Sequence, residues 1–537
     1  MFVKRLTYNL LFLCVALVCH AQDSLLLRDY QFVKQQTPWL TSNNAAGLTR
    51  YNTNNIAEAE AAISYTSGGL RDYWQAANAI EANVLAEAFQ RLSARTVVYG
   101  RISYHNFSGR QMAGSAFMHQ DNARYPFDIV EDSTTNKGQK HSDNYQLTGA
   151  IGIEIWKGYS IGARLDYIAA NYAKYKDLRH SNKLMDFKVS AGATGHVLPQ
   201  LTVGANYQYH RNTESVTFNT YGKEEKVYKS LIDYGAFMGR VEQFGSSGYT
   251  EKGREMPLVE DQHGVSLQIE WQPTQQWAFY NEFSIAHGDG YYGRKSPYTI
   301  TFTNHERDIL EYHGRLSYQT TAARHRLDMC IRSEKLVNNV ETYRELTNAN
   351  GAHYYEYYEA VKAGDKKWMD IRVGYTADLM IKGELPTWTL TANFESRQRK
   401  QTGTVYPYYR KQDLSITSAQ LSGTRNIMLR KGILSATARL CYQKGSGSPF
   451  TDGLYQSPSK EDKTPPTMAD WLYQEYRYLT ASQFGLGADI KYAFILPKTK
   501  LNTFVKGSFS YNATSTSNDF TDGNNRLGLL LAIGCTF

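Results

Sequence analysis

The sequence lacks long hydrophobic runs. Of its 537 residues, 42% are hydrophobic and 20% are charged. Apart from the extreme N-terminus, no stretch reaches the roughly 18 consecutive apolar residues that indicate a membrane-spanning helix. α-Helical membrane spans are therefore excluded.

Cysteine and proline are also scarce. Of five cysteines, two lie near the N-terminus and the others, Cys330, Cys441 and Cys535, are far apart. This spacing excludes a disulfide framework and a CxxC metal site, and we expect no metal and no cofactor. The 13 prolines contrast with 41 glycines and 41 tyrosines, a composition typical of many β-strands.

Catalytic signatures are missing as well. The chain has no HExxH, GxSxG or Walker loop. Four histidines near predicted strand ends, His210, His263, His287 and His313, could serve a barrel enzyme only if folding gathered them into a compact His/Asp/Ser cluster. We expect the protein not to be an enzyme.

The charge balance is mildly basic, with 59 Lys and Arg against 51 Asp and Glu and a net charge of +8. Lysines in the polar stretches stand beside acids, as in residues 223–226 and 460–463. This mixture gives no support for nucleic-acid binding.

Residues 1–21 have the features of a cleaved signal peptide. Lys4 and Arg5 form a positive region, Leu10 to Val18 an apolar one, and Cys19-His20-Ala21 a cleavage site. Cleavage would lower the net charge to +6, since Lys4 and Arg5 are lost. We expect export across the inner membrane.

Alternation of apolar and polar residues dominates the mature chain. Between residues 145 and 155 the apolar positions are Tyr145, Leu147, Gly149, Ile151, Ile153 and Ile155, and the intervening positions are mostly polar or small. Roughly eighteen such segments occur, each near the 9 to 11 residues that a tilted strand needs to cross a bilayer. Residues 56–537 are therefore predicted to form an all-β, antiparallel transmembrane barrel of about 18 strands (16–18).

Connection lengths support this prediction. Short connections are expected at residues 157–158, 198–200, 273–275, 382–386, 430–432 and 497–500, and long polar loops at 108–142, 212–257, 337–367 and 445–475. Outer-membrane barrels combine short periplasmic turns with long extracellular loops in this way. A soluble multi-domain β-protein has no reason to sort its connections so regularly.

The last predicted strand ends in Ile533, Cys535 and Phe537 on an apolar face. This end resembles the C-terminal signal that the outer-membrane assembly machinery of Gram-negative bacteria recognises. Residues 22–55, in contrast, are polar and weakly periodic. They could fold into the lumen as a plug, lie at its periplasmic mouth, or remain a flexible periplasmic tail.

The mature chain resembles the Tyr-rich outer-membrane barrels of the Bacteroidetes, and within them an uncharacterised family. The residues that carry this are 98–104 (VYGRISY), Tyr125-Pro126 with Glu131-Asp132-Ser133, and Asp177-Leu178-Arg179. A more distant similarity, to transporters of hydrophobic compounds with an N-terminal lumenal segment, rests on Asn43 to Gly47. The resemblance implies a fold and a location, but no activity.

Charged residues on the polar face of the strands are candidates for the lumen wall, because a charge facing lipid at mid-depth costs about 2 to 4 kcal/mol. They are Arg164, Asp166, Lys188, Arg326, Asp328, Arg332, Asp370 and Arg372. Two interpretations remain: the charges pair across strands and brace a filled barrel, or they line a hydrated, mildly selective pore.

The sequence therefore predicts an integral outer-membrane barrel, most simply a channel or transporter for small solutes. Its expected partners are outer-membrane lipid, the barrel-assembly machinery and a small solute, but not nucleic acid. The alternative is a structural or interaction barrel that joins other outer-membrane proteins in a secretion or uptake complex.

Overall fold

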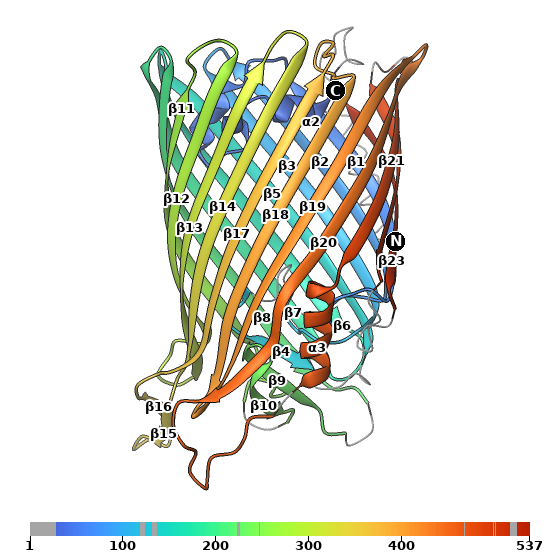
Figure 1. The fold of residues 1–537 in the computed structure, drawn as a ribbon. Coiled ribbons are helices and arrows are strands. Elements are labelled where there is room, and N and C mark those ends of the chain that lie inside the picture. The colour runs from blue at the N-terminus through green and yellow to red at the C-terminus, as the bar shows by residue number, and fades with distance from the viewer. Residues whose placement is uncertain are drawn as a thin grey trace.

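The computed structural model describes residues 28–537 apart from 119–123, 132–136, 223–225, 246–247, 467, 498, 500 and 516–522. The predicted signal peptide and residues 22–27 lie outside the described residues. Eighteen antiparallel strands form one closed sheet (Figure 1), which confirms the predicted barrel.

The barrel strands follow one another around the wall in chain order. They are β1 (Ile56–Gly68), β2 (Asn78–Ser93), β3 (Thr96–Met112), β5 (Gly138–Trp156), β6 (Tyr159–Lys174), β7 (Arg179–Leu198), β8 (Leu201–Asn219), β11 (Met256–Trp271), β12 (Trp277–Gly293), β13 (Thr301–Gln319), β14 (Ala323–Val340), β17 (Val361–Leu379), β18 (Trp388–Val405), β19 (Tyr408–Leu429), β20 (Gly432–Leu454), β21 (Gln483–Ile495), β22 (Asn502–Thr514) and β23 (Asn525–Thr536).

The barrel closes where the first strand meets the last. β1 pairs with β23 from Glu58 opposite Thr536 to Gly68 opposite Arg526. The backbone N–H of Ala57 donates to the carbonyl of Phe537 at 2.7 Å, and the N–H of Phe537 donates back at 2.9 Å. The chain terminus is therefore part of the seam.

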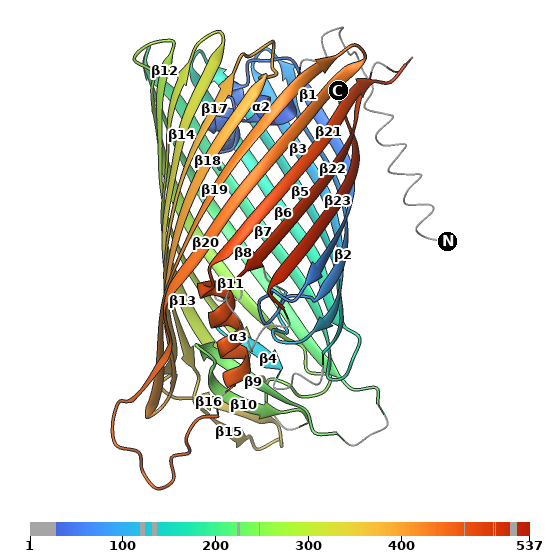
Figure 2. The same ribbon diagram turned by 45° about the vertical axis from the view of Figure 1, so that its right-hand side comes forward.

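The two ends of the barrel differ. At one end, the turn end, the connections run over residues 94–95, 157–158, 199–200, 272–276, 320–322, 380–387, 430–431 and 496–501. The longest connections lie at the opposite, loop end, as 113–137, 220–255, 341–360 and 455–482. Figure 2 shows the helix and the short strands that these loops form at the loop end.

Strand pairing continues farther into the four long loops than predicted. β11, for example, begins at Met256, inside the stretch expected to be loop up to residue 257, and its neighbour β8 continues to Asn219. On the outward face of β8, the apolar side chains of Val203 to Tyr209 give way to Arg211, Thr213 and Ser215 toward the loop end. The alternation of apolar and polar residues ends there because the outward side chains become polar, whereas the backbone hydrogen bonds between the strands continue.

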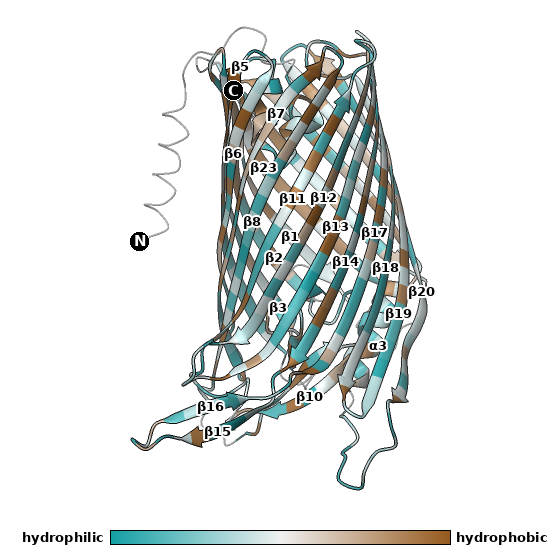
Figure 3. Cartoon of the chain, turned by 90° about the vertical axis from the view of Figure 1, so that its left-hand side faces the viewer, coloured by the Kyte–Doolittle hydropathy of each residue, from teal (hydrophilic) through white to brown (hydrophobic). Residues whose placement is uncertain are grey.

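The two faces of the wall have opposite character. Outward side chains of β23 such as Leu531 and Ile533 are 66% and 57% exposed. Figure 3 shows hydrophobic and hydrophilic residues alternating along the strands. Apolar side chains that no protein covers are what a lipid-facing wall requires.

Residues 28–55, which we call the N-terminal segment, lie inside the turn end of the barrel (Figure 1). They form the short helices α2 (Tyr30–Lys34), η2 (Pro38–Leu40) and η3 (Ala45–Arg50). Asp29 caps α2 by accepting from the N–H of Phe32 at 2.8 Å, and Asn44 caps η3 by accepting from that of Ala46 at 3.2 Å. Among the described residues, no helix has the length and hydropathy to cross a membrane.

At the loop end, the long loops fold inward. A three-stranded sheet of β4 (Asp128–Glu131), β9 (Lys229–Gly235) and β10 (Met238–Gln243) lies there with helix α3 (Ala469–Thr480), and we call these four elements the cap (Figure 2). A hairpin of β15 (Tyr343–Thr347) and β16 (His353–Tyr357) lies beside it. Two apolar clusters, one around Phe127 and Tyr292 and the other around Tyr73 and Trp471, pack the cap against the barrel wall.

Candidate functional site: the barrel lumen

The N-terminal segment is bonded to the lumen wall at Asn44. Its side-chain Nδ2 donates to the carbonyls of Ala193 and Ala205 at 3.1 and 3.2 Å and to Oε1 of Gln268 at 3.0 Å. Asn44 is fully buried. One amide thus joins the segment to β7, β8 and β11.

A row of glycines makes room for this contact. Gly152 stands opposite Gly162, and Gly162 opposite Gly192, on β5, β6 and β7. A Cβ added to Gly162 would lie 2.2 Å from the backbone N of Ala46, and one added to Gly192 would lie 2.4 Å from Oδ1 of Asn44. The three glycines, which we call the glycine seat, let the segment lie directly on the backbone of the sheet.

Trp39 anchors the segment on the neighbouring strands. Its indole is 1% exposed, and Nε1 donates to Oε2 of Glu270 at 2.8 Å. Arg50 also pairs with Glu270, at 3.3 Å. The indole N–H and the buried carboxylate therefore satisfy each other, which a buried tryptophan requires.

Across the lumen, α2 contacts two wall arginines. The guanidinium of Arg324 stacks 3.8 Å from the ring centre of Phe32, and Arg326 donates to Oε1 of Gln35 at 2.5 Å. Both arginines pair with Asp378 on β17, at 3.0 and 3.1 Å. The segment is thus held from two sides of the barrel.

From the loop end, residues 124–126 reach the lumen wall. Arg124 forms ion pairs with Glu334 of β14 and Asp370 of β17. The carbonyl of Arg124 accepts from Nη2 of Arg307 at 2.8 Å, and that of Tyr125 accepts from Nζ of Lys366 at 2.8 Å. These contacts attach the strand entering the cap to the wall.

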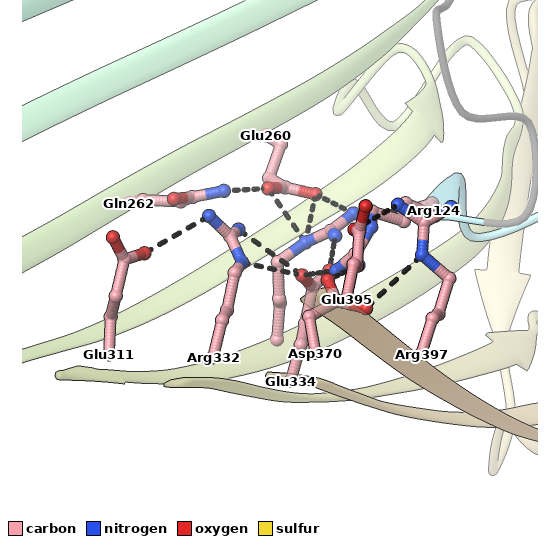
Figure 4. A network of polar contacts seen from close by, with 10 residues as sticks. Arg124, Glu260, Gln262, Glu311, Arg332, Glu334, Asp370, Glu395 and Arg397 are labelled. Carbon is pink, nitrogen blue, oxygen red and sulfur yellow. Dashed lines mark hydrogen bonds and ion pairs between the residues drawn. The ribbon is translucent and has the colours of Figure 1, made fainter. Parts of the chain in front are cut away.

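A network of charges surrounds Arg124 (Figure 4). Glu334, whose side chain is 0% exposed, pairs with three guanidinium groups, those of Arg124, Arg307 and Arg332. Arg307 also pairs with Glu260 at 3.0 Å. A carboxylate without solvent contact is tolerated only when neighbouring charges compensate it in this way.

All eight sequence-predicted lumen residues occupy inward positions of the barrel strands. Arg164 pairs with Asp166, Asp328 with Arg315, Arg326 with Asp378, Arg332 with Glu311 and Glu334, and Asp370 with Arg124 and Arg397. Lys188 and Arg372 have no ion pair among the described residues. The geometry therefore has features of both the braced barrel and the hydrated pore, because most of these charges are paired across the wall and open space remains beside them.

Sequence reasoning missed Arg124, Glu260, Arg307 and Glu334. The two-residue period that led to Arg326, Asp328 and Arg332 continues to Glu334 and could have identified it. Arg124 carried no such signal, because it lies in a loop.

The four candidate histidines do not gather. His210 and His313 are on the lumen face, where His210 bonds Asp186 at 2.8 Å and His313 lies 3.5 Å from Asp328. His263 and His287 face outward. In the described part of the chain, no group of three or more His, Cys, Asp or Glu is arranged to hold a metal ion.

In the described part of the chain, three neighbouring cavities lie in a row along the lumen. The first, about 360 Å³, lies between Asn43 of the N-terminal segment and Arg124, and the second, about 530 Å³, shares Glu311 with it. The third, about 780 Å³, shares Asp328 and Asn393 with the second and extends past Gln35 to Pro386 and Asn426 at the turn end. The shared residues align these cavities along one side of the N-terminal segment.

Solved structures with a similar barrel fold have very different sequences. The ferric preacinetobactin receptor BauA of Acinetobacter baumannii is 7% identical, with 90% of this chain and 80% of that chain covered and a TM-score of 0.40. The outer membrane transporter YddB of Escherichia coli is 9% identical, with 90% and 81% covered and a TM-score of 0.40. The FrpB iron transporter of Neisseria meningitidis is 8% identical, with 92% and 83% covered and a TM-score of 0.40.

No curated protein matches the chain. A family model matches residues 45–537, which include the glycine seat, the lumen wall and the closing strand. The chain belongs to that family, DUF6850, a family of unknown function.

Proposed function

We propose that the protein is an outer-membrane channel or transporter for small solutes, with the turn end in the periplasm and a lumen gated from both ends. Its exposed apolar side chains, such as Leu531 and Ile533, call for lipid. A barrel of 16 to 18 strands is wide enough for an aqueous passage.

The observation that carries the proposal is the way in which the lumen is occupied. The N-terminal segment fills one side through the glycine seat, while the cavity of about 780 Å³ remains on the other side. A barrel whose charges served only to brace a filled interior would not need 780 Å³ of polar space beside that segment. At the loop end, the apolar clusters of the cap close the passage.

Single-channel conductance in planar bilayers tests this proposal. We would compare the intact protein, a variant lacking residues 28–55, a variant with residues 229–243 replaced by a short Gly-Ser linker, and the double variant. Little current is expected from the intact protein, and discrete ohmic steps from the double variant. Silence of a correctly folded double variant would contradict the proposal.

A reversible cross-link separates gating from simple leakage. The hydroxyl oxygens of Thr49 and Ser160 are 2.9 Å apart, so cysteines at both positions can form a disulfide between the N-terminal segment and β6. In the linker variant, with Cys330, Cys441 and Cys535 replaced by serine, oxidation should lower the conductance and reduction should restore it. Each single-cysteine variant is the matched control, and it should not respond.

The interaction barrel is the second candidate function, and the closed cap favours it. Packing of the buried side chains of Phe127, Tyr249, Tyr292 and Trp471 gives the loop end a fixed shape, and other proteins could contact its outer surface. Silence of every conductance variant, together with a co-purifying outer-membrane protein, would support this candidate.

A further inference from the structure

The cavity between the N-terminal segment and residues 124–126 contains opposite charges with unused bonding capacity. Its volume of about 360 Å³ is in the range of small-molecule sites. Its polar lining comes from the segment, the loop end and the wall, and includes Asn43, Arg124, Lys188, Gln208, Glu311 and Arg332.

Lys188 of β7 is the available cation. Its Nζ donates to Oδ1 of Asn43 at 3.1 Å and has no ion pair among the described residues. Asp166 stands opposite Lys188 on β6, but its two carboxylate oxygens accept from Arg164 at 2.7 and 2.8 Å. Asp186, two residues before Lys188, accepts from His210 and Asn212 at 2.8 Å each.

Glu311 of β13 is the available carboxylate. Its Oε2 accepts from Arg332 at 3.3 Å, and its Oε1 has no hydrogen-bond partner in the described part of the chain. Its side chain is 36% exposed. The same cavity also contains an unused acceptor, since Oε1 of Gln208 is buried without a partner among those residues.

The other charges that line the cavity are neutralised. Arg307 pairs with Glu260 and Glu334, and Arg124 pairs with Glu334 and Asp370. An anion alone or a cation alone would therefore leave either Glu311 or Lys188 facing an empty position. A ligand carrying both charges would satisfy both.

We propose that this cavity binds a small zwitterion, a free amino acid or short peptide, whose carboxylate meets Lys188 and whose ammonium group meets Glu311. This inference rests on the proposed transport function and names its class of solute. The carboxylate would replace Asn43 on Lys188, so that binding would remove one contact of the N-terminal segment.

Calorimetric titration of the full-length mature protein in detergent tests the assignment with three related probes. Tri-alanine carries both charges, N-acetyl-tri-alanine only the carboxylate, and tri-alanine amide only the ammonium group. Tri-alanine should bind. Each blocked probe should bind at least about tenfold more weakly than tri-alanine, because one charge-assisted hydrogen bond is lost.

Two substitutions identify the contacts. In Lys188→Gln, tri-alanine and its amide should bind equally, and in Glu311→Gln, tri-alanine and its N-acetyl form should bind equally. Lys183→Gln is the matched control, since Lys183 lies on the same strand but its side chain is 78% exposed on the opposite face. Lys188→Arg, which keeps the charge, should retain the preference for the free carboxylate. Asn43→Ala should tighten tri-alanine binding a few-fold.

Several outcomes would overturn the assignment: no binding of tri-alanine, equal binding of all three probes by the intact protein, or an unchanged preference in both Gln variants. Heat-modifiable migration in electrophoresis verifies that each variant is a folded barrel. Because binding is measured without current, tri-alanine binding by a protein that never conducts would contradict the channel and leave the site intact. Conductance without tri-alanine binding would contradict the zwitterion site and leave the proposed channel intact.

Discussion

At the scale of single residues, Gly162 is required for close approach rather than for an unusual backbone conformation. It lies inside strand β6, and an added Cβ would lie 2.4 Å from the carbonyl carbon of Ala45 as well as 2.2 Å from the N of Ala46. Both of these atoms belong to backbone, which cannot move aside as a flexible side chain can. Any larger residue must therefore displace the N-terminal segment.

Gly162→Val should release the N-terminal segment while leaving the barrel assembled, because the new side chain points into the lumen. We expect trypsin to cleave after Lys34 and Arg50 in the variant and to spare the native protein. Gly149→Val is the control, since nothing lies within 4 Å of a Cβ added there. Equal protection of the two variants would refute the glycine seat.

Arg124→Gln should loosen the strand that enters the cap. Among the described residues, the substitution leaves Glu334 with two of its three guanidinium partners and Asp370 with its ion pair to Arg397. Breaking a buried ion pair costs about 3 kcal/mol, equivalent to more than a hundredfold in a local opening equilibrium. Hydrogen exchange of residues 124–131, measured by mass spectrometry, should speed up accordingly.

Arg332→Gln provides the comparison for Arg124→Gln. It removes another guanidinium partner of Glu334, from wall strand β14, and keeps Arg124 in place, so exchange in residues 124–131 should stay close to native. A similar acceleration in both variants would mean that the network acts as a whole and that Arg124 is not a specific attachment.

At the scale of elements, the cap and the loop over residues 69–77 that packs against it contain buried carboxylates. Burial raises the pKa of Asp72, in the loop over residues 69–77, to about 8, and the nearby Glu475 adds to the shift. Burial also raises the pKa of Asp233 on β9 to about 6. Charged groups facing them are Asp128, Glu475, Lys366 and Arg399.

The cap should therefore dock more tightly in acid. In the docked state both carboxyl groups keep their proton at pH values above 4, where a free aspartate, with a pKa of about 4, has lost it. Their contribution to the stability of docking is therefore complete below about pH 4. It is lost as pH rises through 6 and then 8. In a variant lacking residues 28–55, open probability in bilayers should be higher at pH 8.5 than at pH 5.

Replacing Asp72 and Asp233 by asparagine should flatten this pH dependence, since the amide is neutral at every pH. Asp177→Asn, in the loop over residues 175–178, is the control and should leave it unchanged. A pH profile that survives the double substitution would assign the effect to other groups.

At the scale of the whole molecule, the barrel depends on its last strand. Residues 533–537 pair with residues 57–61 of β1 on one side and with residues 502–505 of β22 on the other. Deleting Ile533–Phe537 should abolish assembly, because the seam would lose both its hydrogen bonds and the outward apolar side chain of Ile533. Immunoblotting of outer-membrane fractions measures this, and normal levels of a heat-modifiable barrel would disprove it.

A milder change separates the terminal residue from the seam. Phe537→Ala keeps the backbone bonds to Ala57 and removes only the aromatic side chain. If the assembly machinery reads that side chain, membrane levels should fall although the pairing is intact. Unchanged levels would limit the role of residues 533–537 to pairing.

The barrel, the approximate number of its strands and the face on which each strand residue lies follow from the order of the amino acids. These properties are local, because an alternation with period two, as in residues 145–155, states which side chains face the same way. For the same reason, Arg164 and Asp370 could be assigned to the lumen. The alternation stops where the outward side chains become polar, so the predicted end of β8 lies before residue 212 although the strand continues to Asn219.

What fills the lumen depends on contacts between residues that are far apart in the chain. Arg124 meets Glu334 from 210 positions away, and Asn44 meets Gln268 from 224 positions away. Residues 28–55 have too little periodicity to say whether they lie inside or outside, and their place depends on Gly152, Gly162 and Gly192 being brought into one row by strand pairing. Contacts of this kind arise from closure of the sheet and inward folding of loops, and neither leaves a regular pattern in the chain.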